Sequence, residues 1–199
     1  MADHKVSVVK LLFFEWHSFM NKGIERGLKE LEIPYDTFFY QFNDWEKDDA
    51  FLEQFRAYLK AGTYTDVLSV NFSPLISMLC EELGIVYTAW VYDSPLHIRN
   101  LESLKNSCNR IFFFDRGQAE EHHKNGVNAM HLPLAVDTGV FRINASKREK
   151  EDYRTDISLV GKLYQTEYAY FTAPLQGYTK GYLEGIVNAQ GKVYGGYLI

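Results

Sequence analysis

The sequence predicts an α/β protein whose main domain is a doubly wound, Rossmann-like parallel sheet covered by helices. Short apolar runs alternate with longer amphipathic stretches, and strands that alternate with helices are typical of βαβ units. The runs 85–92 and 110–114 are almost continuously apolar, as expected for strands in the buried middle of such a sheet. The chain has 199 residues, of which 46% are hydrophobic and 16% are aromatic, so it can bury a substantial core.

The individual elements follow from hydrophobic periodicity between turn residues. Strands are expected at 6–14, 35–42, 66–72, 85–93, 110–115 and 128–135. Helices are expected at 18–33, 44–62, 73–84, around 96–107, and at 117–126.

Capping residues support several of these helices. Ser18 and Asp44 are suitable N-caps for the first two helices, and Gly62 is a suitable stop for the second. The pair Ser73-Pro74 opens the third helix, because serine caps well and proline is favoured at the first helical position, and the helix closes on Gly84.

The organisation changes after the last expected strand. We expect residues 1–137 to form the first domain and residues 138–155, which carry the mixed charge run "SKREKEDYR", to form a linker. Residues 156–199 then begin a second domain, with a strand at 156–164 and a helix at 178–195. The alternation stops there, so this second domain is expected to be incomplete.

Composition argues against several classes of protein. The formal charge is −5, from 21 basic and 26 acidic residues, and no basic face suggests nucleic-acid binding. Cys80 and Cys108 are too few and too far apart for a disulfide framework, so we expect reduced thiols in a cytoplasmic protein. The N-terminus lacks the features of a signal peptide. No uninterrupted apolar run reaches the roughly 18 residues of a membrane span.

Familiar catalytic and cofactor motifs are also missing from the sequence. It contains no GxGxxG after the first strand, no GxxxxGK[ST] and no GxSxG. Asp93 and His97 could be drawn as two metal ligands, but two ligands do not make a site. We therefore expect no metal ion and no cofactor.

Polar side chains gather where the expected strands end, and ligands of open parallel sheets bind at the carboxyl ends of the strands. The candidates are Glu15, His17, Asn71, Ser73, Asp93, Ser94, His97, Asp115 and Arg116. Each has a plainer interpretation as well. Asp93 is equally suited to cap the next helix, His17 could be a surface histidine, and Asn71 could bond only the local backbone. The pair His122 and His123 lies among charged residues and is interpreted as a solvated helix face.

The segment "VLSVNFSPLISMLCEELGIVYTAWVYDSP" resembles the N-terminal domain of bacterial glycosyltransferase-like proteins of the CgeB, or spore maturation, type. "GQAEEHHKNGVNAMHLPLAVD" is similar to the end of that domain, and "TDISLVGKLY" and "KGYLEGIVNAQGKVYG" are similar to the start of the next one. The likeness covers most of residues 60–199, whereas residues 1–60 match only in pattern.

The resemblance implies a GT-B architecture, in which two Rossmann-like domains face each other across a cleft. The N-terminal domain then holds the acceptor, the C-terminal domain holds the nucleotide-sugar donor, and no metal ion is generally needed. Because nearly all of the second domain is missing, the chain is expected to be part of a longer protein and inactive alone.

The implied reaction is attack of an acceptor hydroxyl on the anomeric carbon of the donor. An inverting enzyme needs a base for that hydroxyl, and the candidates are His17, Glu15 and Asp93; a retaining enzyme needs none. The remaining polar residues at the strand ends are expected to bind substrate. Gly161 and Lys162 would lie at the edge of the donor-phosphate site.

Two other functions stay open at this stage. A non-catalytic module that binds a glycan or a protein would also explain the aromatic content, because aromatic rings stack on sugars. A receiver-like regulatory domain would need an aspartate after the third strand, where this sequence has Asn71.

Overall fold

The computed structural model describes residues 9–140 and 168–193. Its Cα positions divide the chain into two units, Met1–Arg142 and Ile143–Ile199, and the division falls inside the expected linker. Each unit is described by itself.

The first unit contains a six-stranded, all-parallel sheet with the order β2-β1-β3-β4-β5-β6. The strands are β1 (Leu11–Glu15), β2 (Tyr35–Phe39), β3 (Asp66–Val70), β4 (Val86–Val91), β5 (Asn109–Phe113) and β6 (Ala129–His131). This architecture confirms the predicted α/β fold with a parallel, Rossmann-like sheet. Strands β2 and β6 form its two edges.

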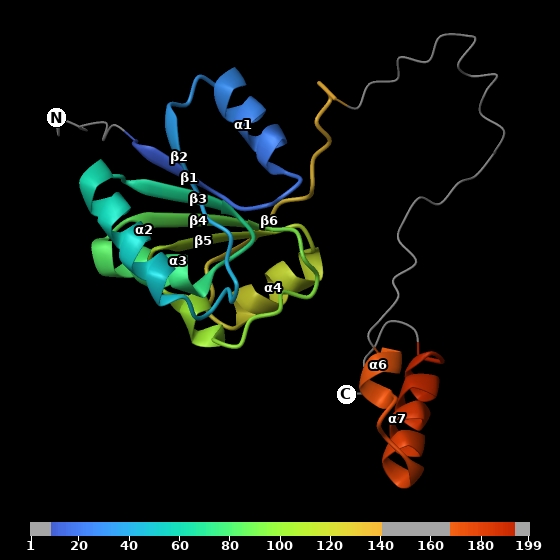
Figure 1. Ribbon diagram of the computed structural model, residues 1–199. Coiled ribbons are helices and arrows are strands. Elements are labelled where there is room, and N and C mark those ends of the chain that lie inside the picture. Colours follow the sequence, from blue (N-terminus) through green and yellow to red (C-terminus); the bar gives the residue numbers. More distant parts are fainter. Residues whose placement is uncertain (1–8, 141–167, 194–199) are drawn as a thin grey trace, which may run out of the picture. The chain divides into compact units, whose positions relative to one another are not determined.

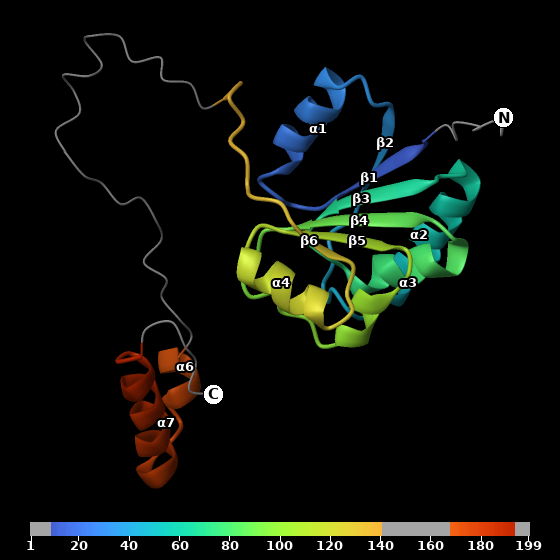
Figure 2. The same cartoon turned by 180° about the vertical axis from the view of Figure 1, so that it is seen from behind.

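Helices cover both faces of this sheet (Figures 1 and 2). The helices are α1 (Asn21–Glu30), α2 (Asp49–Gly62), α3 (Pro74–Leu83) and α4 (Arg116–Lys124), with a short 3-10 helix η1 (Leu101–Lys105) between β4 and β5. Helix α1 lies on one face, and α2, α3 and α4 lie on the other. The sheet is therefore doubly wound.

Most of the core lies between the sheet and the face that carries α2, α3 and α4. Leu12 and Phe14 of β1 belong to this core, together with Phe51 and Phe55 of α2. Because side chains alternate along a strand, Phe13 points to the opposite face, where it is buried on the side of α1.

The caps of α3 are those that the sequence predicts. The Ser73 hydroxyl accepts a hydrogen bond from the Ile76 amide at 3.4 Å, Pro74 occupies the first turn, and Gly84 ends the helix at φ 67°. Positive φ is a conformation in which glycine has no steric cost.

Two predicted helix starts are wrong. Helix α2 is capped by Asp48, which accepts from the Phe51 amide at 2.9 Å, and Asp44 instead binds the Arg99 side chain. Helix α1 has Met20 at its N-cap position without a side-chain capping bond. The Ser18 hydroxyl accepts from the Met20 amide, so it stabilises the turn before the helix.

The helix expected around 96–107 is also shorter than predicted. Only Leu101–Lys105 is helical, as a 3-10 turn. The amides of Leu96, Arg99 and Asn100 donate to side chains from other parts of the chain. A backbone amide bound in this way cannot also donate to a helical carbonyl.

The described part of the second unit contains α6 (Tyr168–Thr172) and α7 (Gly177–Gln190). Helix α7 lies where the sequence predicts a helix, although it ends at Gln190. The strand predicted at 156–164 lies outside the described residues.

Among the residues that the structure describes, no helix has the length and apolar character needed to cross a membrane. Cys80 and Cys108 are both free thiols.

Candidate functional site

The carboxyl ends of all the strands lie at one edge of the sheet, because every strand pairing is parallel. The chain passes from β1 outward to β2 and then returns to β3 on the other side of β1. This reversal is the topological switch point, and ligands of open α/β sheets bind in the crevice outside the strand ends at such a point. The geometric premise behind the predicted site is thus met.

A pocket of about 190 Å³ lies at this switch point. Its lining comes from the segments that follow β1, β2, β3 and β4. The lining residues are Trp16, Trp45, Asn71, Phe72, Asp93, Leu96, His97 and Ile98. Aromatic and aliphatic side chains thus surround an amide, a carboxylate and an imidazole.

Asn71 joins the ends of β3 and β4 and is buried. Its Nδ2 donates to Asp93 Oδ2 at 2.7 Å, and its Oδ1 accepts from the Tyr92 amide at 3.0 Å. The backbone of Asn71 has φ 59°, a left-handed conformation that is uncommon outside glycine and in which asparagine is enriched. Strained backbone of this kind gathers at functional sites, and here it directs the amide toward Asp93.

A buried hydroxyl network supports the turn that carries Asn71. The Tyr87 hydroxyl accepts from the Ser73 amide at 3.0 Å and lies 2.7 Å from the Ser69 hydroxyl. Ser69 in turn donates to the Asn71 carbonyl at 2.7 Å. Burial is the main cause that raises the pKa of Tyr87, so its hydroxyl stays neutral and keeps its proton as a hydrogen-bond donor in this network.

Two tryptophans form the aromatic part of the pocket wall. Trp16 donates from Nε1 to the Val70 carbonyl at 2.9 Å, which fixes its ring beside the end of β3. The rings of Trp16 and Trp45 meet edge to face with centroids 5.0 Å apart. Trp45 also packs on Phe42 of the main core at 4.8 Å. Both rings are therefore anchored by the fold itself.

Three of the predicted site residues, Asn71, Asp93 and His97, are brought together in this pocket. Ser73 is fully buried as the cap of α3. The Ser94 hydroxyl donates to Asp115 at 2.9 Å.

Asp115 and Arg116 begin helix α4. Asp115 caps it by accepting from the Gln118 amide at 3.1 Å, and this bond is the main cause that lowers the pKa of Asp115. Arg116 is the first residue of the helix. Neither residue lines the pocket.

The other two base candidates, Glu15 and His17, lie at the same edge but outside the pocket lining. The His17 ring packs on Phe39 with centroids 5.1 Å apart. Glu15 follows Phe14 in β1, so alternation directs it away from the main core. Burial, followed by the charge of Glu25, raises the pKa of Glu15.

This raised pKa predicts that Glu15→Gln stabilises the protein at neutral pH. Folding favours the protonated form, so the contribution of Glu15 to stability is fully present below its ordinary pKa of 4.5 and is lost as pH rises through the folded value. The Tm of the variant should exceed that of the wild type at pH 7, and the difference should vanish near pH 4. Glu120→Gln, at an exposed carboxylate on α4, is the control. An equal gain at both pH values would contradict this reasoning.

Sequence reasoning missed the contribution of Trp45 to the site. This residue lies in "NDWEKDD", in the segment that leads from β2 to α2. None of the expected strand-end candidates comes from the segments after the second and sixth strands of the sheet. The same strand-end argument, extended to the segment after β2, points to this tryptophan. Leu96 and Ile98 give no such signal, because an apolar side chain in a loop is ordinary.

Residues 9–140 and 168–193 hold no group of three or more His, Cys, Asp or Glu side chains arranged to bind a metal ion. Gly161 and Lys162, expected at a donor-phosphate site, lie outside these ranges.

Neither the protein-family models nor the curated proteins yield a match to this chain.

Proposed function

We propose that this chain is the acceptor-binding part of a glycosyltransferase of the CgeB type, and that the pocket at the switch point binds a sugar ring. The observation that carries the proposal is the pairing of aromatic walls with the bonded carboxylate and amide of Asp93 and Asn71. Aromatic rings pack against the apolar faces of a sugar, and carboxylates and amides bond its hydroxyls.

The size of the pocket supports an acceptor over a donor. Its volume of about 190 Å³ is smaller than the roughly 300–1,000 Å³ of sites that enclose a drug-sized ligand. One sugar ring suits this space better than a nucleotide sugar does. The resemblance to CgeB-type proteins implies that a C-terminal domain holds the donor, with Gly161 and Lys162 at the edge of its phosphate site.

Asp93 is the base candidate that the pocket geometry favours. Its Oδ2 is bonded to Asn71, which leaves Oδ1 to accept a proton from an acceptor hydroxyl. General bases act on groups within hydrogen-bond reach, and Asp93 lines the pocket while Glu15 and His17 do not. A retaining mechanism would leave Asp93 with a binding role only.

The charge of the lining predicts a preference for neutral rings. The eight lining residues include one carboxylate and no lysine or arginine. A carboxylate on the ligand would therefore meet Asp93 without a lysine or arginine in the lining to compensate its charge. Titration of the chain with methyl glucoside and with glucuronate, followed by tryptophan fluorescence, should show tighter binding of the neutral ring, by about tenfold if the repulsion is near 1.4 kcal/mol.

The same titration tests the proposal, because Trp16 and Trp45 report occupancy of the pocket. The double variant Trp16→Phe, Trp45→Phe should lose the fluorescence change, and Trp90→Phe, outside the lining, should keep it. A flat titration with a panel of neutral glycosides would contradict sugar binding here.

A non-catalytic glycan-binding module is the second candidate, and the same pocket would serve it. Transfer separates the two: the protein at its full natural length should release nucleoside diphosphate from a nucleotide sugar only when a bound acceptor is present. Sugar binding without such release across a donor panel would favour the binding module.

A further inference from the structure

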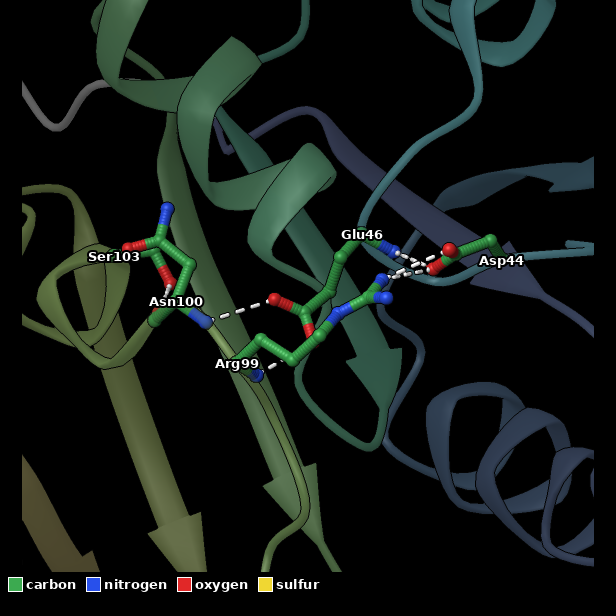
Figure 3. A network of polar contacts seen from close by, with 5 residues as sticks. All are labelled: Asp44, Glu46, Arg99, Asn100 and Ser103. Carbon is green, nitrogen blue, oxygen red and sulfur yellow. Dashed lines mark hydrogen bonds and ion pairs between the residues drawn. The ribbon is translucent and has the colours of Figure 1, made fainter.

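Four residues connect the segment after β2 to the segment after β4 (Figure 3). The Glu46 carboxylate accepts hydrogen bonds from two successive amides, those of Arg99 at 2.6 Å and Asn100 at 2.8 Å. The Arg99 guanidinium donates from Nη2 to both carboxylate oxygens of Asp44, at 2.6 and 2.8 Å. We call these residues, Asp44, Glu46, Arg99 and Asn100, the carboxylate clasp.

The clasp is directly adjacent to the pocket on both segments. Trp45, which lines the pocket, lies between the two acids of the clasp, and Leu96, His97 and Ile98 immediately precede Arg99. The clasp therefore joins two contributors to the pocket lining, which come from positions more than fifty residues apart in the chain.

Within the clasp, the bonds of Glu46 should stabilise the structure more than the ion pair between Asp44 and Arg99 does. Its side chain is 13% exposed, whereas those of Asp44 and Arg99 are 41% and 70% exposed. Exposed ion pairs contribute little because water and salt screen them. Hydrogen bonds from backbone amides to a shielded carboxylate are stronger, since the acceptor is charged.

Asn100 extends the network toward the core. The Ser103 hydroxyl donates to the Asn100 carbonyl at 2.6 Å, and Ser103 is buried in η1. One end of the bound segment is thus fixed by η1 and the other by the Gln118 side chain, which accepts from the Leu96 amide at 2.8 Å. Glu46 holds the middle.

We propose that Glu46 is a positioning residue for the pocket: by binding the Arg99 and Asn100 amides, it holds the wall formed by Leu96, His97 and Ile98 opposite Trp45. The ligand named for this pocket rests on the proposed function, whereas the placement of the wall does not. Without the carboxylate, the two amides lose their acceptor and the wall moves away from Trp45, so a bound ring loses contacts.

Glu46→Gln tests this role with almost no change of shape. A glutamine can accept from one amide, but its NH₂ group faces the other amide as a second donor. We expect hydrogen exchange at the Arg99 and Asn100 amides to accelerate about tenfold or more, and the Kd for methyl glucoside to rise about tenfold.

The matched control is Glu82→Gln. Glu82 also binds an arginine through both carboxylate oxygens, with Arg56 Nε and Nη2 at 3.0 and 2.9 Å, but it joins α2 to α3 and does not line the pocket. This variant should leave both the exchange of the two amides and the Kd unchanged. A second variant, Asp44→Asn, removes one of the two carboxylates that face the Arg99 guanidinium and keeps the other, Glu46. It should therefore change the exchange rates far less than Glu46→Gln does.

Two results would overturn the proposal: slow exchange at Arg99 and Asn100 in Glu46→Gln, or fast exchange with an unchanged Kd. If the wild type binds no glycoside, the proposed function fails, but the positioning role of Glu46 can still be tested. In that case two measurements on Glu46→Gln test the placement of the wall: hydrogen exchange at the two amides, and acrylamide quenching of Trp45 in a Trp16→Phe, Trp90→Phe background. Faster exchange together with stronger quenching supports the placement. An unchanged exchange rate or unchanged quenching overturns it.

Discussion

Phe14→Ala should lower the free energy of unfolding by about 3–5 kcal/mol, the range measured when buried aromatic side chains are truncated in protein cores. The Phe14 ring is completely buried, and its centroid lies 5.6–5.7 Å from those of Phe42, Phe51 and Phe55. Removal of the ring leaves a cavity where β1, α2 and the segment that carries Trp45 meet. Urea unfolding, followed by tryptophan fluorescence, gives the value.

Phe39→Ala provides the control, because Phe39 belongs to the neighbouring strand and is 53% exposed. Its cost should stay below about 1 kcal/mol, as is usual for surface positions. A loss in Phe14→Ala as small as that in the control would show that the surrounding rings collapse into the space and that this cluster is not tightly packed.

Asp93→Asn should weaken the binding of a neutral glycoside by about 10- to 100-fold. A hydrogen bond to a charged group contributes about 1.5–3 kcal/mol, and each 1.4 kcal/mol is a factor of ten. The asparagine can still accept from Asn71 Nδ2 through its oxygen, so the fold is maintained. Its NH₂ group then replaces the carboxylate oxygen that faces the ligand, and a donor takes the place of an acceptor.

Asp66→Asn is the comparison for this experiment. Asp66 begins β3, so it lies at the opposite end of the sheet from the pocket, and its variant should bind the glycoside like the wild type. Fluorescence titration or calorimetry measures both. Equal affinities in Asp93→Asn and the wild type would remove this carboxylate from the binding site.

The elements that the sequence predicts well are those whose signals are local. Ser73, Pro74 and Gly84 act through bonds and backbone angles within one helix, and they cap α3 as expected. Asp44 and Asp48 have the same capping chemistry four residues apart. Asp48 caps α2, whereas Asp44 binds Arg99, which lies 55 residues away in the chain. Local sequence does not contain that contact.

The candidate site likewise has parts that the sequence predicts and parts that depend on distant contacts. The strands of a parallel sheet all end at one edge. The sequence alone therefore predicts that Asn71, Asp93 and His97 lie at the same edge. The position of Glu15 outside the pocket also follows from the sequence. Side chains alternate along a strand, so a glutamate next to the buried Phe14 must face the other side of the strand. The contribution of Glu46 was not, since it depends on two backbone amides in a distant loop.

The two edges of the sheet bear on how copies of this protein meet one another. An exposed edge strand has unpaired amides and carbonyls with which a strand of another chain can pair. Short edge strands and proline limit such pairing. Strand β6 has three residues, and Pro133 follows it closely. Strand β2 has five residues and is preceded by Pro34. The short length of β6 and the prolines beside both edge strands therefore oppose aggregation through strand addition.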